Sequence, residues 1–495
     1  RRPVGKTLLC ACEDVTLADV RRAFALGHRD LESLKRYTGL GTGPCQGKSC
    51  LALAARELLR LGATPGEATP FTARPPLHPP TLAALAAIDP DSLPPGPGVP
   101  LAPAEPPPAP RPSGPLPPRA DVVIVGGGIM GLALAWELAR RGRTEVVVLE
   151  RSYLNAGASG RNGGGVRAQW STPTMIRLAR RSIEICDRFA SEMGVNVWFR
   201  RGGYLFLAAG EPQLRSIQQN LDLHRRMGLR TRLLSPVEAA ELVPQLDAAR
   251  FLAAAWNPDD GVVFPWPFLW GYAARAEALG VKVRTFTEVI GFESAGRRLT
   301  AVATSRGTIA CGTVVNACGA WSKQVAGLAG VSLPNRPVRH EILVTEATKP
   351  WLGPLVSVLD TGLYFSQSGR GEIVGGMGDP REPEGLEMGS SLRFLARFAR
   401  AIAACAPITA GLRVLRQWAG CYDVTPDNNP VLGAAGFDNF LQMSGFVGHG
   451  FMMAPAVAEL MAEWMTGRAR DEIFERFTVE RFAGGRTVRE DFIIG

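Results

Sequence analysis

The chain has 495 residues, of which 46% are hydrophobic and 20% are charged. At about 100–200 residues per domain, this length predicts several domains that can each bury a core, and the apolar fraction excludes a chain that is disordered throughout. The formal net charge is +9, from 55 basic and 46 acidic residues. Without a long basic run or interleaved aromatic residues, this charge does not indicate nucleic-acid binding. No apolar run is long enough to cross a membrane and no export signal is evident, so we expect a cytoplasmic protein.

The cysteines are concentrated near the N-terminus. Four of the nine fall within the first 50 residues, and the odd total argues against a disulfide framework. Three segments with a helical pattern, 16–27, 30–39 and 47–61, lie among and around these four. Residues 1–63 are therefore predicted to form a small, helical, cysteine-bearing domain.

These four cysteines are spaced as ligands of one inorganic centre. Cys10 and Cys12 can point to the same face of an extended segment, whereas Cys45 lies in a tight loop and Cys50 begins the next helix. Four converging thiolates suit a [2Fe–2S] cluster or zinc, although the C-x-C pair is unusual for structural zinc. The pattern C-x-C…C-x₄-C, with the string TGPCQGKSC, resembles the bacterioferritin-associated-ferredoxin family over residues 8–62. That resemblance implies a [2Fe–2S] cluster held by these four thiolates.

A proline-rich region follows over residues 64–119. Residues 71–120 contain 18 prolines, which exclude a helix or a central strand over most of this stretch. Two interpretations stay open: a semi-rigid extended linker, or a segment that lies along the surface of a partner, where prolines lower the entropy cost of docking.

From residue 120 onward the pattern changes to a buried strand, a glycine turn, a helix and a second strand. Gly126, Gly128 and Gly131 form a G-x-G-x-x-G motif directly after the first strand. The first glycine permits a tight turn, the second lets a pyrophosphate approach the backbone, and the third lets the helix pack on the strand. Glu150 ends the second strand, where an acidic side chain bonds a ribose. The motif predicts a dinucleotide but does not distinguish NAD from FAD.

Four further motifs follow in order. They are ASGRNGGGVRAQW (158–170), VVNACGAW (314–321), WAGCYDVTPDNNPVLG (418–433) and SGFVGHGFMMAPAVAELM (444–461). Together with the glycine motif they resemble the D-amino-acid-oxidase-like flavoprotein family, from residue 120 to about residue 470. The resemblance is closest to sarcosine oxidase β-subunits and to opine, hydroxyproline and proline dehydrogenases.

This resemblance implies an α/β (α+β) fold with a discontinuous, Rossmann-like FAD-binding domain. We expect the oxidoreductase domain to span residues 120–480, with a C-terminal tail at 481–495. An antiparallel substrate sheet is expected largely from residues 196–260 and 336–410. The helical [2Fe–2S] module would precede this domain.

The resemblance also implies a set of FAD contacts beyond the fingerprint glycines and Glu150. Ser159 and Arg161 are expected at the phosphates or the ribityl chain. The full set of further contacts is Ile129, Met130, Arg151, Ser159, Arg161, Asn162, Gly163, Gly164, Val289, Ala317, Trp321, Gly448, His449, Gly450 and Met452.

A glycine-rich loop at 445–450 precedes a predicted helix that starts near Phe451, with Pro455 in its first turn. Backbone N–H groups at a helix N-terminus would stabilise the negative charge of a reduced flavin. In similar enzymes this GHG loop lies against the isoalloxazine. A simple packed turn is the alternative.

Three residues are expected to act on the substrate. Arg167 corresponds to the arginine that holds the substrate carboxylate in the resembling sarcosine oxidases, a task that suits a bidentate guanidinium. Tyr422, aligned on the TPD triplet, would orient the substrate amine or carboxylate. His449 would lie by the flavin or assist proton movement. The alternatives are a surface arginine, a structural tyrosine and a histidine packed against backbone.

Two positions depart from the family pattern. The cysteine that tethers flavin in monomeric sarcosine oxidases aligns with Gly420, so we expect no covalent attachment there. The lysine of their GHGFK string, which assists the reaction with oxygen, is Met452 here. Because a thioether cannot stabilise developing superoxide, we expect poor reactivity with oxygen.

We therefore predict an FAD-dependent dehydrogenase that oxidises the C–N bond of a small amino acid or N-substituted amino acid, of the opine, proline, hydroxyproline or sarcosine class. Hydride would pass to flavin N5 and electrons onward to the [2Fe–2S] cluster and partner subunits. The resemblance implies a hetero-oligomer in which an FMN can sit at an interface, and peripheral membrane association stays open. The alternatives are a non-catalytic electron-transfer or scaffold subunit and an NAD-linked dehydrogenase.

Overall fold

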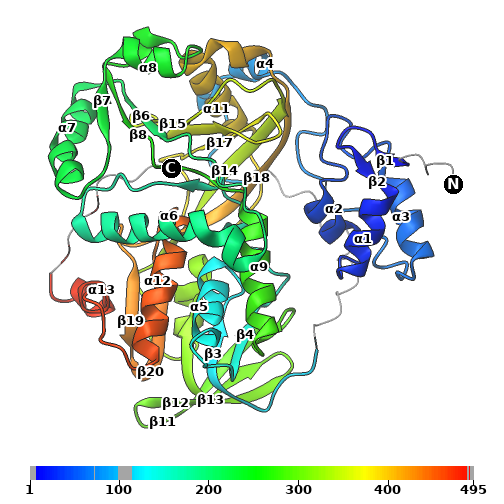
Figure 1. The fold of residues 1–495 in the computed structure, drawn as a ribbon, viewed down its shortest axis with the longest axis vertical. Coiled ribbons are helices and arrows are strands. Elements are labelled where there is room, and N and C mark those ends of the chain that lie inside the picture. The colour runs from blue at the N-terminus through cyan, green and yellow to red at the C-terminus, as the bar shows by residue number, and fades with distance from the viewer. Residues whose placement is uncertain (1–6, 72, 98–113, 486, 488–489, 491–495) are drawn as a thin grey trace.

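The computed structural model describes residues 7–71, 73–97, 114–485, 487 and 490. A small N-terminal module lies beside a larger, elongated body that contains two extended sheets (Figure 1). One sheet and its helices form the lower half of the body in this view, and the other sheet forms the upper half. The first of these halves carries the dinucleotide motif.

The N-terminal module is built from short, well-capped helices. The Thr16 hydroxyl accepts a hydrogen bond from the Asp19 N–H at 3.1 Å, and the Asp19 carboxylate accepts from the Thr16 N–H at 2.8 Å. This reciprocal capping box fixes the start of the first helix. Asp30 caps the second helix by accepting from the Ser33 N–H. The elements are β1 (Leu8–Cys10), β2 (Val15–Thr16), α1 (Leu17–Ala25), α2 (Leu31–Thr38) and α3 (Leu51–Arg60).

The described part of the proline-rich region lies on the larger body. It contains the short helix α4 (Leu82–Ala86), whose Leu82 and Leu85 are buried in a core that they share with the upper sheet. The Leu82 N–H donates to the Leu412 carbonyl at 2.8 Å, and the Val414 N–H donates to the Pro80 carbonyl at 2.9 Å. Residues 75–97 are thus docked on a protein surface, which belongs to the same chain. The rest of the expected linker, 98–113, lies outside the described residues.

The lower sheet has the parallel centre of a dinucleotide-binding domain. Its order is β10-β4-β3-β13-β12-β11, and β20 pairs with β13 and β19. Strands β10, β4, β3, β13 and β20 are parallel, whereas the β11–β12–β13 and β19–β20 pairings are antiparallel. The strands are β3 (Arg119–Val125), β4 (Val146–Leu149), β10 (Lys282–Arg284), β11 (Val289–Ala295), β12 (Arg298–Thr304), β13 (Gly307–Asn316), β19 (Val431–Ala435) and β20 (Phe437–Ser444).

Helices cover this sheet. Helix α5 is almost wholly buried because α9 and α12 pack against it, and α6 runs across the junction between the two halves (Figure 1). The helices are α5 (Ile129–Ala139), α6 (Pro173–Met193), α9 (Pro265–Ala278), α10 (Ser322–Gly327), α12 (Gly450–Met465) and α13 (Ile473–Arg476).

The upper sheet has the order β18-β14-β17-β16-β15-β6-β8-β7. Helices α7, α8 and α11 flank it (Figure 1). Its strands are β6 (Tyr204–Ala208), β7 (Arg232–Leu234), β8 (Ala253–Asn257), β14 (Arg336–Ala347), β15 (Leu355–Val358), β16 (Leu363–Gln367), β17 (Glu372–Met377) and β18 (Val414–Val424). The helices are α7 (Glu211–Arg226), α8 (Pro236–Leu242) and α11 (Leu392–Cys405), and β5 (Gly165–Val166) pairs with β9 (Gly261–Val262) in a separate small ladder.

The mixed α/β fold class is confirmed, with two differences in the upper sheet. The sheet is not wholly antiparallel, because β15 and β6 pair in parallel where two distant chain segments meet. It also includes β18, which lies beyond the expected range of 336–410 and pairs with β14 over most of its length. Among the described helices, none is both long and apolar enough to cross a membrane.

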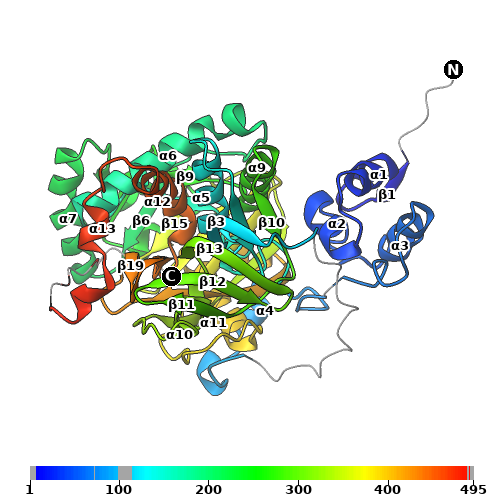
Figure 2. The same cartoon turned by 90° about the horizontal axis from the view of Figure 1, so that it is seen from below.

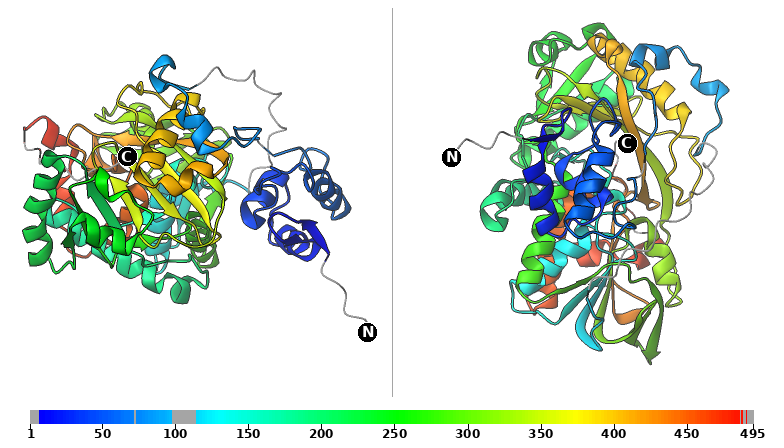
Figure 3. Two further views of the ribbon diagram at one scale, coloured as in Figure 1. Left: turned by 90° about the horizontal axis from the view of Figure 1, so that it is seen from above. Right: turned by 90° about the vertical axis from the view of Figure 1, so that its right-hand side faces the viewer.

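The module stands to one side of the body, next to the edge that carries α9 and β10 (Figure 2). Viewed from that side, it lies at mid-height, level with the junction between the two halves (Figure 3). The module is therefore close to the place where the two sheets meet.

Candidate functional site

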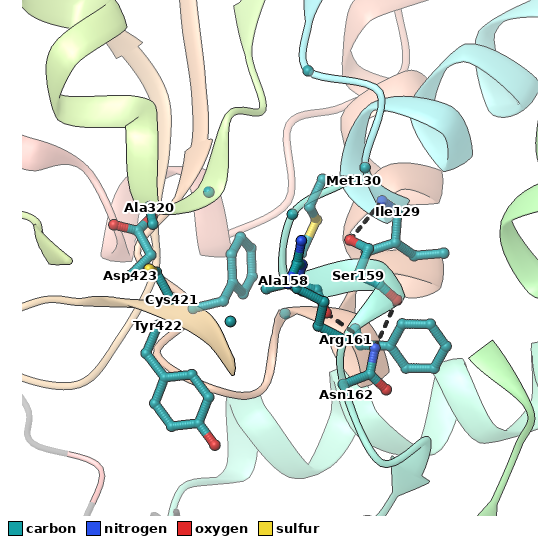
Figure 4. Close-up of a pocket in the computed structure, with 18 of the residues that line it drawn as sticks. Ile129, Met130, Ala158, Ser159, Arg161, Asn162, Ala320, Cys421, Tyr422 and Asp423 are labelled. Carbon is teal, nitrogen blue, oxygen red and sulfur yellow. Dashed lines mark hydrogen bonds between the residues drawn. The ribbon is translucent and has the colours of Figure 1, made fainter. Parts of the chain in front are cut away.

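A cavity of about 830 Å³ extends along the junction between the two sheets. Its walls come from the glycine turn after β3, the loop at 150–164, the start of α12 and the facing strands of the upper sheet. Figure 4 shows part of this wall, where Ser159 and Arg161 face Cys421 and Tyr422 across the space. Every predicted FAD contact except Gly131, and all three predicted substrate residues, line this one cavity.

The glycine turn leaves no room for side chains. Gly126 has a φ of +113°, and a Cβ there would lie 2.5 Å from the Ala317 carbonyl oxygen. A Cβ on Gly131 would overlap the Gly126 carbonyl, so this glycine serves the packing of α5 on β3 and stays out of the cavity. The turn thus brings bare backbone to the cavity at the N-terminus of a helix, where a phosphate is favoured.

The Glu150 carboxylate organises the neighbouring loops. It accepts hydrogen bonds from the backbone N–H groups of Gly127 and Ser152, both at 2.9 Å. Burial raises the pKa of Glu150 above its ordinary value. On the opposite side of the turn, the Ser159 hydroxyl accepts from the Ile129 N–H at 3.0 Å (Figure 4). Both side chains therefore fix the shape of the nucleotide end.

Asn155 is a cavity residue that the sequence motifs did not indicate. It has a left-handed φ of +71°, the residue is 2% exposed, and among the described residues neither its Oδ1 nor its Nδ2 has a hydrogen-bond partner. A buried amide without partners costs free energy unless a ligand supplies them. Because this amide lies in the cavity wall, the cavity fits a polar cofactor such as FAD, which offers both donors and acceptors.

Arg161 anchors the middle of the cavity. Its guanidinium donates to the Ala156 carbonyl at 2.7 Å and to the Ala419 carbonyl at 3.0 Å, which links the 150–164 loop to β18. Trp418 returns a hydrogen bond from its indole N–H to the Arg161 carbonyl at 3.0 Å. Arg161 therefore joins the two halves of the body beside the cavity.

The GHG loop brings the start of α12 to the cavity. A Cβ on Gly448 would overlap the ring of Tyr422, so only glycine lets these two positions pack together. The helix begins at Gly450, and Phe451 and Met452 in its first turn line the cavity. We expected Pro455 in the first turn of this helix, but the helix begins at Gly450 and Pro455, its sixth residue, lies inside it.

Arg167 lies deep in the cavity wall at 1% exposure. Its guanidinium lies 4.0 Å from the ring centroid of Trp170 and donates to the Gln169 carbonyl. Its Nη2 is 3.3 Å from the Nε2 of His449. Burial lowers the pKa of Arg167, although an arginine remains protonated in proteins. Arg167 is therefore a buried cation and not the solvated surface charge that the sequence left as the alternative.

The contact with Arg167 determines the tautomer of His449. Because a guanidinium can only donate, the His449 Nε2 must accept, and the proton of the neutral ring sits on Nδ1. Burial, together with Arg167 and His340, holds the pKa of His449 well below its usual range, so the ring is neutral. Its buried Nδ1 has no hydrogen-bond partner in the structure. The cavity wall thus holds an N–H donor that a ligand can satisfy.

Tyr422 belongs to an aromatic group that sequence reasoning missed. His340 stacks on Tyr422 with 4.5 Å between ring centroids, and its Nε2 is 3.0 Å from the hydroxyl of Tyr364. Burial lowers the pKa of His340 to about 3 and raises the pKa of Tyr422 above its ordinary value. Tyr204 lines the same region. These strand residues have no local motif, and only the register of the upper sheet brings them together.

The four N-terminal cysteines converge in pairs. The thiol of Cys12 interacts with that of Cys45, and the thiol of Cys50 with that of Cys10. A Cβ on Gly43 would overlap the Cβ of Cys12, so this glycine allows the loop to approach the first pair. Cys10 and Cys50 are buried, whereas Cys12 is exposed.

The cysteine loop also supplies backbone donors. Burial raises the pKa of Cys45, but hydrogen bonds from the Ser49 N–H, the Cys12 thiol and the Gly47 N–H together outweigh it and lower that pKa below the ordinary value. Across the residues that the structure covers, no group of three or more His, Cys, Asp or Glu side chains is arranged to hold a metal ion.

The module contacts the cavity wall itself. The Arg36 guanidinium on α2 donates to the Tyr153 hydroxyl at 2.7 Å and lies 4.1 Å from the ring centroid, and Tyr153 lines the cavity. Arg416 on β18 donates to the carbonyl of Thr42, which also accepts from the Gln46 side chain next to Cys45. The cysteine loop is therefore joined by hydrogen bonds to the strand that carries Tyr422.

A glycine turn between parallel strands, a bare helix N-terminus and a cavity with a buried arginine in its wall are the features of a dinucleotide-dependent oxidoreductase. Residues 121–464 match the FAD dependent oxidoreductase family, and the chain belongs to that family. It is an enzyme of the FAD-dependent oxidoreductase class. Residues 4–89 match the sarcosine oxidase A3 domain. This domain is not a ferredoxin, so the predicted cluster stays a prediction.

Several known proteins resemble the chain over most of its length. It is 30% identical to the sarcosine oxidase subunit beta of Rhizobium meliloti, over 75% of this chain and 91% of that protein. It is 29% identical to the subunit of the same name from Rhodobacter capsulatus, over 76% and 92%. The crystal structure of L-proline dehydrogenase from P. horikoshii superposes with a TM-score of 0.72 at 34% identity, covering 75% of this chain and all of that one.

Proposed function

We propose that this chain is a dehydrogenase that oxidises the C–N bond of a small amino acid or N-substituted amino acid, of the proline, hydroxyproline, opine or sarcosine class. The observation that carries the proposal is the buried Arg167 in the cavity wall, with His449 and Tyr422 lining the same cavity. A cation and two hydrogen-bonding groups in one cavity suit a carboxylate with an adjacent amine.

The residues present fit FAD as the cofactor. The glycine turn, the Ser159 and Glu150 contacts and the partnerless Asn155 amide form the nucleotide end, and the start of α12 forms the flavin end. FAD, when bound, supplies the acceptor for the hydride of the C–H bond beside nitrogen. The chain's own residues bind and orient the substrate for that transfer.

Each wall residue has a specific part in this proposal. Arg167 binds the carboxylate, because its fork-shaped guanidinium can bind both oxygens in one geometry. Tyr422 orients the amine or carboxylate, and His340 supports it by stacking. His449 holds Arg167 through Nε2 and offers its Nδ1 proton to the cofactor or substrate. The first turn of α12 stabilises negative charge through its N–H groups.

The N-terminal module is proposed to hold a [2Fe–2S] cluster. Its support is that the four cysteines form two interacting pairs of thiols, beside a loop that Gly43 brings close to Cys12. Four thiolates are the ligand set of such a cluster. Zinc on the same thiolates is the alternative, and iron and sulfide analysis separates the two.

The contacts of the module favour delivery of electrons within one chain. Arg36 contacts the cavity residue Tyr153, and Thr42 near Cys45 contacts Arg416. The cluster would therefore serve the flavin of its own polypeptide. Electrons would pass on to partner subunits, since two relatives are named as subunits. We further propose that an FMN binds at a subunit interface and that the protein is cytoplasmic. We also propose that the reduced flavin reacts slowly with oxygen, because Met452 offers no positive charge to stabilise superoxide.

The function is tested by adding candidate amino acids to the FAD-loaded protein without oxygen. We expect one class to bleach the flavin absorbance without nicotinamide. The variant Arg167→Ala should raise the half-saturating amino-acid concentration by about two orders of magnitude, since the lost pairing is charged and buried. A matched control is Arg225→Ala, which removes an exposed arginine on α7.

No bleaching by any amino acid, with FAD present, would contradict the proposal and favour a scaffold role. Bleaching by reduced nicotinamide alone would instead favour an NAD-linked enzyme. An unchanged half-saturating concentration in Arg167→Ala would place carboxylate binding elsewhere.

A further inference from the structure

The C-terminal tail returns to the segment that carries Arg167. Glu490 is fully buried at 0% exposure. Its carboxylate accepts hydrogen bonds from the Ser171 N–H at 2.8 Å and from the Thr172 hydroxyl at 3.1 Å, and the Ser171 hydroxyl donates to it as well. A carboxylate that is buried to this degree is stable only when it is hydrogen-bonded in this way.

The site of contact is the end of the loop that presents Arg167. The Trp170 indole N–H donates back to the Arg167 carbonyl at 3.1 Å, so the loop is a closed turn. Thr172 is the N-cap residue of α6, and its side chain accepts no hydrogen bond from the first N–H groups of the helix. Glu490 places a negative charge at the N-terminus of this 21-residue helix, where an anion is favoured.

A second contact ties the tail to the segment after Tyr422. The Glu490 N–H donates to the Asp427 carbonyl at 3.3 Å, and the Asp427 carboxylate pairs with both Nε and Nη2 of Arg481 at 2.9 Å. The Asp427 and Arg481 side chains are each 4% exposed. Asp427 belongs to the loop that follows β18. The backbone and the side chain of Glu490 thus join the turn that follows Arg167 to the loop that follows Tyr422 and β18.

We propose that Glu490 is a positioning residue, which holds the Arg167 loop through Ser171 and Thr172 so that the guanidinium is placed to receive the substrate carboxylate. This inference rests on the proposed function, in which Arg167 binds the substrate. The carboxylate of Glu490 does not itself touch the substrate in this account. Its effect must therefore pass through Arg167.

The test compares three full-length, FAD-loaded variants in anaerobic flavin reduction by the amino acid that bleaches the wild type. Glu490→Ala removes the carboxylate, Glu490→Gln keeps the shape and an acceptor oxygen, and Glu480→Ala removes an exposed acid ten residues before Glu490. The half-saturating concentration reports substrate binding, and the limiting rate reports hydride transfer. A double variant, Glu490→Ala with Arg167→Ala, reports whether the two residues act together.

We expect Glu490→Ala to raise the half-saturating concentration about tenfold with little change in the limiting rate, because a displaced guanidinium binds the carboxylate poorly. Glu490→Gln should recover most of the loss, and Glu480→Ala should match the wild type. In the Arg167→Ala background, Glu490→Ala should add nothing.

Four results would overturn the inference. They are an unchanged half-saturating concentration in Glu490→Ala, equal losses in the Ala and Gln variants, the same loss in Glu480→Ala, or a full additional loss in the double variant. A wild type whose flavin no amino acid reduces would instead contradict the proposed function, and the two failures are thereby distinguished.

Discussion

At the scale of single residues, burial sets the protonation of the groups around Arg167. Asp260 is fully buried, and its carboxylate accepts from the Ala168 N–H, the Asn257 amide and the Gln169 amide at 2.8–3.0 Å. Burial raises the pKa of Asp260 to about 7 from an ordinary value of 3.8. Between these two pH values, the Asp260 carboxyl is protonated in the folded state and ionised in the unfolded state.

This shift predicts how stability depends on pH. Since the folded state binds the extra proton, the contribution of Asp260 to the free energy of unfolding is fully present below about pH 4 and is lost as the pH rises through about 7. Asp260→Asn should remove this decline, measured as urea midpoints between pH 4 and pH 8.

The neighbouring Asp259 provides a control with the opposite sign. A hydrogen bond from Arg230 lowers the pKa of Asp259, so its contribution is lost as the pH falls. Asp259→Asn should therefore leave the decline between pH 4 and pH 7 in place. The same decline in Asp260→Asn and in the wild type would show that this carboxyl does not titrate as described.

At the scale of elements, local motifs could predict the nucleotide end of the site but not the substrate end. The turn at Gly126 and the helix after it follow from short-range sterics, and both appear in the sequence as a motif. His340 and Tyr364 come from different strands of the upper sheet and meet only through its register. Glu490 is farther still, because its partners lie about 320 residues earlier in the chain.

The surface on which the proline-rich region docks could not be predicted from local motifs either. Prolines predict that most of the segment has no regular structure, but they do not determine which surface it meets. In the structure, Leu82 of α4 is fully buried against the upper half, whereas Leu77, just before it, is 64% exposed. The exposure of these two leucines differs because only Leu82 faces the surface on which the segment is docked.

Leucine truncations test this docking. Leu82→Ala should lower the free energy of unfolding by about 2–5 kcal/mol, because it leaves a cavity in a shared core. Leu77→Ala should change it by less than about 0.5 kcal/mol, as expected for an exposed site. The measurement is urea unfolding of the full chain. Equal effects in the two variants would mean that the segment is not docked in solution.

At the scale of the whole molecule, the two sheets meet around one cavity, the module contacts its wall, and the docked segment packs on the upper half. Arg36 on the module contacts Tyr153, and α4 is buried in the core of the upper half. The Glu490 carboxylate is hydrogen-bonded to the loop that follows Arg167. Composition and cysteine spacing predict an order of domains along the chain. They do not predict the side of the body on which the module sits, since it depends on surface contacts such as those of Arg36.

The central claim is that one polypeptide takes electrons from a C–N bond and passes them to an iron–sulfur centre. The most direct test counts electrons in an anaerobic titration of the purified chain with dithionite and with the amino-acid substrate, followed by absorbance and EPR. We expect about three electrons per chain, two for the flavin and one for the cluster, and about two in Cys45→Ser. The variant of the buried Cys186, Cys186→Ser, should still take up about three. Uptake of about two electrons by the wild type, with zinc or no metal bound, would contradict the central claim.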